Sequence, residues 1–310
     1  MIKPPKLKIG DTIGILSPAG PVNKRKLNLG ILRLKKLGYK VFLDRNVLAK
    51  RGFLAGPDRT RANALNRMFA NPKIKAILSA RGGYGTLRIL ELLDYKIIKK
   101  NPKILVGFSD ITALHLAIYK RCNLVTFHGP MVAGDFSKLS EFNKNYLFRA
   151  VSQTEPIGKI QNSNRIGNWR VITPGKTSGK ILGGNLTLIC RLLGTDFKPD
   201  FKNKILFLED FKSEPYQIDG MLAQLQMAGI LDQVKGVILG EMVGCEAKNL
   251  KYPSLKLRKV FQDYFKNRPY PVIYPVSCGH GKDKITIPLG VTATIDTYKK
   301  ILSIDEAGVK

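Results

Sequence analysis

The first half of the chain alternates short apolar runs with segments whose apolar residues recur every three or four positions. Leu27, Ile31 and Leu34 would share one face of a helix that closes at Gly38. The short apolar runs between such segments are typical of buried strands. Alternation of strands and helices predicts a parallel sheet covered by helices on both faces. We expect strands at 11–16, 40–43, 76–79, 104–106 and 124–127, and helices at 27–37, 58–70, 86–93 and 111–119.

The pattern breaks after Glu155. Gly, Asn, Thr, Ser and Lys dominate as far as about Lys180, which indicates a linker or an irregular junction. Later segments are richer in alternating, threonine-containing strands, with a strand at 205–208, a helix at 216–228, a strand at 237–239 and further strands at 285–289 and 291–297. The predicted fold class is α/β, with an N-terminal parallel-sheet domain with flanking helices and a β-rich α+β C-terminal domain. We place the N-terminal domain at 1–155, the linker at 156–180 and the C-terminal domain at 181–310.

The charge of the chain is strongly positive, with a formal net charge of +29 over 310 residues. Such a charge allows nucleic-acid binding, because Lys and Arg displace counterions from phosphates. The basic residues are spread along the whole chain, however, and no tail or arginine–aromatic motif concentrates them. We therefore expect no nucleic-acid partner, although a basic nucleic-acid-binding protein stays a remote alternative. The charge would also draw small anionic substrates toward a cleft.

Apolar runs in the sequence fall far short of the roughly 18–20 residues that a membrane span needs. The N-terminal segment contains Asp11 and lacks a small-residue cleavage site, so we do not interpret it as a signal peptide. We expect a cytoplasmic protein without a membrane partner.

The four cysteines, Cys122, Cys190, Cys245 and Cys278, form no CxxC pair and match no zinc-site spacing. We expect buried free thiols rather than a disulfide framework. Cys278 and His280 could supply two metal ligands, but nothing nearby supplies a third and a fourth, so we expect no metal.

A glycine-rich loop, Arg81-Gly82-Gly83-Tyr84-Gly85, lies between a predicted strand and a predicted helix. Backbone N–H groups at such a turn favour negative charge, so the loop could form an anion or oxyanion site. It is neither a Walker loop, because the GK[ST] ending is absent, nor a GxGxxG fingerprint. A plain tight turn is the alternative.

Ser109 lies where the strand at 104–106 meets the following helix, in the stretch Gly107-Phe108-Ser109-Asp110-Ile111. Serine is a preferred helix N-cap, because its hydroxyl accepts a bond from a free backbone N–H. It could also be a nucleophile at a sharp strand-to-helix turn, but Ile111 breaks the GxSxG signature. The local sequence favours the N-cap and leaves the nucleophile open.

A nucleophilic serine needs a base within hydrogen-bond reach and an acid that orients this base. The chain contains only three histidines. His115 lies on the helix after Ser109 and would point to another face, whereas His128 ends a strand and could line a pocket. His280 lies between two glycines, which suits display on a loop. Glu209 ends an apolar strand, at the edge where open α/β sheets place their sites, although a charge that only reaches water is the alternative.

Taken together and in this order, five motifs resemble those of the LD-carboxypeptidase family of serine peptidases. This family includes muramoyltetrapeptide carboxypeptidases and microcin C immunity peptidases. The segments Ser17-Pro18-Ala19-Gly20 and 58–66 also resemble it. The motifs are GGYG at 82–85, GFSD at 107–110, GGNL at 183–186, LED at 208–210 and GHG at 279–281.

This resemblance implies a Ser–His–Glu triad in which Ser109 is the nucleophile, His280 the general base and Glu209 the acid. It also implies that the backbone N–H of Asp110 forms one half of the oxyanion hole. The Gly82–Gly83 turn supplies the other donor, for which we favour Gly83. The nucleophile would come from the N-terminal domain, and the acid and base from the C-terminal domain.

Family substrates are murein tetrapeptides, cut between the L-centre of the third residue and the terminal D-alanine during peptidoglycan recycling. The resemblance implies a small peptide substrate, a homodimer and neither cofactor nor metal. Arg81, Gly82, His128 and Asn185 are candidates for substrate binding. The alternative within the family is a microcin C-type immunity peptidase that cleaves an aminoacyl-nucleotide amide, with Trp169 as a weak candidate for stacking on the base.

Overall fold

The structure, a computed structural model, describes residues 1–249, 251 and 253–310 and contains two β-sheets. The first sheet has six strands in the order β12-β5-β4-β3-β1-β2. All neighbouring strands are parallel except β12, which pairs antiparallel with β5. Its strands are β1 (Thr12–Leu16), β2 (Lys40–Leu43), β3 (Ile74–Ser79), β4 (Ile104–Gly107), β5 (Thr126–His128) and β12 (Ile287–Leu289).

Helices follow the strands of the first sheet as the apolar spacing predicts. The first of them begins after Asn23, whose side chain accepts a hydrogen bond from the Lys26 N–H at 3.0 Å, and it buries Leu27 and Leu34 on one face. The segment predicted as a helix at 86–93 is instead a short 3₁₀ helix. The helices of this half are α1 (Lys24–Lys36), α2 (Asp58–Ala70), η1 (Leu87–Leu92), α3 (Tyr95–Lys100), η2 (Ser109–Ile111), α4 (Thr112–Cys122), η3 (Phe136–Lys138) and α5 (Glu141–Ser152).

The second sheet has eight strands in the order β6-β14-β13-β8-β9-β10-β11-β7. Its middle strands β8 to β11 are parallel, and the strands on both sides of them are antiparallel. This mixture agrees with the predicted α/β class with a β-rich second half. The strands are β6 (Gly158–Lys159), β7 (Arg170–Thr173), β8 (Lys176–Asn185), β9 (Lys204–Phe211), β10 (Gly236–Val243), β11 (Val272–Gly279), β13 (Thr292–Asp296) and β14 (Ile301–Ile304).

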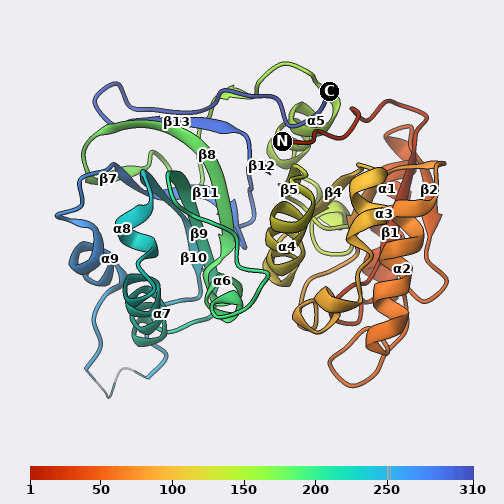
Figure 1. Cartoon of the computed structure of the whole chain (residues 1–310), viewed down its shortest axis with the longest axis horizontal. Helices are drawn as coiled ribbons and strands as arrows, with labels where there is room; N and C mark the ends of the chain where they lie inside the picture. Colours follow the sequence, from red (N-terminus) through yellow and green to blue (C-terminus); the bar gives the residue numbers. More distant parts are fainter. Residues whose placement is uncertain (250, 252) are drawn as a thin grey trace.

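Two helices lie between the sheets at the centre of the molecule. Figure 1 shows α4 of the first half beside α6 of the second half, and α4 contacts both α6 and β8. The chain ends also meet, because the backbones of Lys6 and Lys310 are joined by a 2.9 Å hydrogen bond. The helices of the second half are α6 (Leu186–Leu192), α7 (Pro215–Met227), α8 (Ile230–Gln233) and α9 (Leu257–Phe265).

Two segments differ from the sequence-based expectation. The range 156–180 contains β6, β7 and the beginning of β8, so part of it belongs to the second sheet. Short polar strands at sheet edges give almost no apolar pattern, and β7 finds its partner far along the chain in β11. The strand predicted at 285–289 exists as β12, but it joins the first sheet through β5.

The four cysteines are free and buried, as predicted. In the part of the chain that the structure describes, no helix is both long and apolar enough to cross a membrane.

Candidate active site

Ser109 lies two residues beyond the carboxyl end of β4, after Phe108, and has a left-handed backbone with a φ of 63°. Such a conformation costs a non-glycine residue about 1–3 kcal/mol and persists only where the surroundings impose it. The Ser109 side chain caps neither η2 nor α4, whose N-cap residues are Phe108 and Ile111. The N-cap interpretation is therefore wrong. Ser109 instead lies on a strained strand-to-helix turn, the kind of turn on which a nucleophile can be displayed.

The glycine-rich loop lies against this turn. A Cβ added at Gly82 would lie 3.0 Å from Ser109 Cβ and 3.3 Å from Ser109 Oγ, so only glycine fits there without displacement. Asp110 ties the two segments together, because its carboxylate accepts a 2.8 Å bond from the Thr86 N–H. Burial raises the pKa of Asp110. The hydrogen bonds from Thr86 act in the opposite direction but do not outweigh burial. Gly83 follows with a φ of 110°.

Glu209 and His280 form a short polar contact in the site. Glu209 lies on β9 and is fully buried, and His280 directly follows β11. His280 Nδ1 lies 2.6 Å from Glu209 Oε2. Gly240 of the intervening β10 allows the approach, because a Cβ there would lie 3.1 Å from Glu209 Cβ. A buried carboxylate thus orients the His280 imidazole through Nδ1.

Aromatic rings hold His280 on two sides. The Phe211 ring stacks on the imidazole at 4.6 Å, and the Phe108 ring meets it edge-on at 4.9 Å. Phe108 immediately precedes Ser109, so His280 lies beside the Ser109 turn. Among the described residues no hydrogen bond joins Ser109 Oγ to His280. Catalytic hydrogen bonds are often long before substrate binds and tighten in the complex.

Glu209 is charged over most of the pH range. Burial alone would raise its pKa, but the neighbouring His280 and His128 outweigh burial and lower the pKa to about 2. The carboxylate is therefore available as a hydrogen-bond acceptor for the imidazole wherever the protein is folded.

This lowered pKa predicts how stability depends on pH. Because the unfolded carboxyl takes up its proton near pH 4.5 and the folded one near 2, the stabilisation is complete above pH 4.5 and lost as the pH falls toward 2. We expect Glu209→Gln to lose less unfolding free energy than the wild type between about pH 6 and about pH 3, measured by urea unfolding. Equal losses in both proteins would contradict the lowered pKa.

The other two histidines are buried. His115 Nε2 lies 2.9 Å from the Gly107 carbonyl oxygen, and burial lowers its pKa to about 3. His128 is only 1% exposed, so its side chain cannot line an open pocket as expected. Its Nε2 lies 3.8 Å from Glu209 Oε1.

The remaining substrate-binding candidates lie on two sides of the site. Arg81 is exposed and donates a 2.9 Å bond to the Pro21 carbonyl oxygen. Asn185 pairs in register with Glu209. Its Oδ1 caps α6 by accepting a 3.2 Å bond from the Leu188 N–H.

Sequence reasoning missed the residues that hold the His280 loop. Asn143 on α5 donates to the Lys282 carbonyl oxygen at 3.1 Å and accepts from the Lys284 N–H at 2.7 Å. Arg165 joins Glu241, at 2.8 Å, to Asp283 of this loop, at 3.8 Å. These partners are far apart in the sequence, and none belongs to a motif that could have indicated them.

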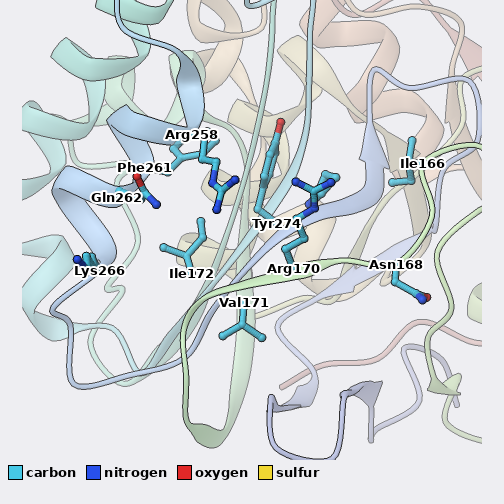
Figure 2. A pocket seen from close by; sticks show the side chains of 11 residues that line it. Ile166, Asn168, Arg170, Val171, Ile172, Arg258, Phe261, Gln262, Lys266 and Tyr274 are labelled. Carbon is cyan, nitrogen blue, oxygen red and sulfur yellow. The ribbon is translucent and has the colours of Figure 1, made fainter.

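A separate cavity of about 400 Å³ lies between β7 and α9. Figure 2 shows Arg170, Arg258 and Tyr274 lying together in it. None of the sequence-predicted site residues lines this cavity.

In the described residues, no group of three or more His, Cys, Asp or Glu side chains could hold a metal ion.

Comparison with known proteins identifies the family. The family model of the LD-carboxypeptidase N-terminal domain matches residues 13–129, and that of the C-terminal domain matches 178–295. The chain belongs to the LD-carboxypeptidase family. Membership of this peptidase family agrees with the resemblance drawn from the five motifs.

Two relatives and two solved structures illustrate the range of this LD-carboxypeptidase family. A probable murein peptide carboxypeptidase of Bacillus subtilis is 38% identical, over 99% of this chain and 95% of the relative. The microcin C7 self-immunity protein MccF of Escherichia coli is 29% identical over 97% of this chain and 94% of its own. The MccF structure with glutamyl sulfamoyl guanosine has a TM-score of 0.92 at 25% identity, with both chains fully covered. The muramoyltetrapeptide carboxypeptidase of Oxalobacter formigenes has a TM-score of 0.83 at 30% identity, covering 96% of this chain and 98% of that one.

Proposed function

We propose that this LD-carboxypeptidase is a serine hydrolase that removes the terminal D-alanine from murein tetrapeptides. The observation that carries the proposal is the strained Ser109 turn beside the 2.6 Å pair of Glu209 and His280. The B. subtilis relative, at 38% identity, supports the choice of substrate. We further propose a cytoplasmic homodimer that acts in peptidoglycan recycling.

In the proposed reaction, His280 takes the proton of the Ser109 hydroxyl, and the oxygen attacks the scissile amide carbonyl. Glu209 holds the imidazole through Nδ1 and stabilises the imidazolium that forms. The N–H groups of Asp110 and Gly83 would bind the oxyanion, and each such donor is worth roughly 2.7–4 kcal/mol in comparable sites. His280 then gives its proton to the amine of D-alanine as the C–N bond breaks, and water hydrolyses the acyl-enzyme.

The proposed catalytic residues come from two parts of the chain. Residues 1–155 would carry the nucleophile, and 181–310 the acid and base. The substrate carries several carboxylates, which the charge of +29 would attract. Exposed Arg81 is the proposed carboxylate binder, while Gly82 and Asn185 would border the scissile bond.

MccF supports a second candidate activity, cleavage of an aminoacyl-nucleotide amide. Its structure with glutamyl sulfamoyl guanosine resembles this chain over its whole length. A nucleotide needs a stacking surface, and Trp169, the only tryptophan, is half-buried in the segment before β7.

One competition assay separates the two candidates. Purified protein is given a murein tetrapeptide and a glutamyl sulfamoyl nucleotide, and kcat/KM is measured for each. We expect D-alanine release to exceed nucleotide release by at least about 100-fold, a difference of about 2.7 kcal/mol in transition-state binding. Trp169→Phe should leave the tetrapeptide reaction unchanged. Faster cleavage of the nucleotide substrate, with loss on Trp169→Phe, would favour the immunity function.

A further inference from the structure

Two buried polar atoms face each other behind the candidate triad, and neither has a hydrogen-bond partner among the described residues. They are His128 Nε2 and Glu209 Oε1, which lie 3.8 Å apart and are both unsatisfied. His128 is 1% exposed and Glu209 0%. A buried polar atom left without a partner is costly, and the gap exceeds an N–H···O bond by only about 0.6–1.1 Å.

His128 is held firmly in this position. It ends β5, where it pairs in register with Gly107 of β4 and with Ile287 of β12. Its ring meets the Phe207 ring of β9 edge-on at 4.9 Å and lies 6.0 Å from the Phe108 ring. The imidazole therefore reaches from the first sheet to a carboxylate of the second sheet.

The same strand pair also carries the nucleophile. Gly107, the register partner of His128, lies two positions before Ser109 on the same backbone. A bond from His128 to Glu209 would fix the acid of one sheet against the nucleophile's strand in the other. Glu209 would then use one oxygen for each histidine, Oε2 for His280 and Oε1 for His128.

We propose that His128 is a positioning residue that donates its Nε2–H to Glu209 Oε1 in the working enzyme. The proposal rests on the triad assigned above. It replaces the expectation that His128 binds substrate. Because His128 acts through Glu209 and His280, its loss should lower kcat and leave KM unchanged.

The activity test uses two substitutions with murein tetrapeptide as substrate. His128→Phe keeps an aromatic ring beside Phe207 but removes the donor, and we expect kcat to fall by about 10- to 100-fold at unchanged KM. His128→Gln places an amide N–H near the position of Nε2 and should recover most of the lost kcat. Wild-type kcat in His128→Phe, or a raised KM shared by both variants, would overturn the proposal.

A spectroscopic test needs no activity. The chain has only three histidines, so a ¹⁵N-histidine spectrum separates His115, His128 and His280. We expect His128 protonated at Nε2, with a downfield proton that shifts in Glu209→Gln while the His115 signals stay in place. An unprotonated Nε2, or no shift, would refute the bond. If Ser109→Ala stays active while this signal is present, the triad fails and the His128 bond survives.

Discussion

Replacement of Ser109 by alanine is expected to lower kcat for tetrapeptide hydrolysis by roughly 10⁶-fold, the loss seen when a serine peptidase loses its nucleophile. The Ser109 hydroxyl lies on the strained turn beside Gly82, where an added Cβ would be 3.3 Å from Ser109 Oγ. KM should change little, because the missing oxygen forms its bond only in the transition state. Steady-state release of D-alanine, with active-site titration of the wild type, measures the effect.

The controls for Ser109→Ala use the fact that losses of kcat in triad variants do not add. His280→Ala should cost about as much as Ser109→Ala, and the double variant should be no worse than either, because the residues act as a unit. Ser137→Ala removes a hydroxyl that donates to the Gly134 carbonyl oxygen at 3.0 Å, and it should keep wild-type kcat. Turnover by Ser109→Ala within tenfold of the wild type would rule out the assigned nucleophile.

The sheet positions of the site were predictable because local patterns determine them. The apolar runs at 104–106 and 205–208 predicted the strands β4 and β9, and both exist. Each candidate residue follows or ends a buried strand, where parallel sheets gather their sites. The five ordered motifs then indicated which of these strand ends belong together.

The backbone of Ser109 could not be predicted from its neighbours in sequence. Serine after a strand favours an N-cap by local preference. The left-handed turn depends instead on the close approach of Gly82 and on the Asp110–Thr86 bond, which joins residues 24 positions apart. Contacts between residues so far apart do not produce a recognisable pattern of residues in the sequence.

The same reason explains why His128 was assigned to the wrong surface. A histidine at the end of a strand could face a pocket or the interior, and the local sequence does not distinguish the two. Phe207, which closes over its ring, belongs to the other sheet. Burial of the ring therefore became visible only once the two sheets were placed together.

Gly279→Ala is expected to damage both activity and stability, because Gly279 lies against Glu209. Its φ is +95°, and a Cβ there would lie 2.6 Å from Glu209 Oε2, the oxygen that bonds His280. The methyl group must displace this carboxylate, so kcat should fall by about 10⁴-fold, as when a triad loses its acid.

Gly10→Ala is the matched control, because Gly10 has a φ of +90° and nothing within 4 Å of the added Cβ. It should lose about 1–3 kcal/mol of unfolding free energy from backbone strain alone and keep its kcat. Gly279→Ala should lose more than this in urea unfolding, since the clash with Glu209 adds to the same strain. The difference between the two variants therefore isolates the contact with the acid. If both variants lost equal stability and both kept kcat, Glu209 would not be confined by Gly279, and the geometry assigned to the base would be wrong.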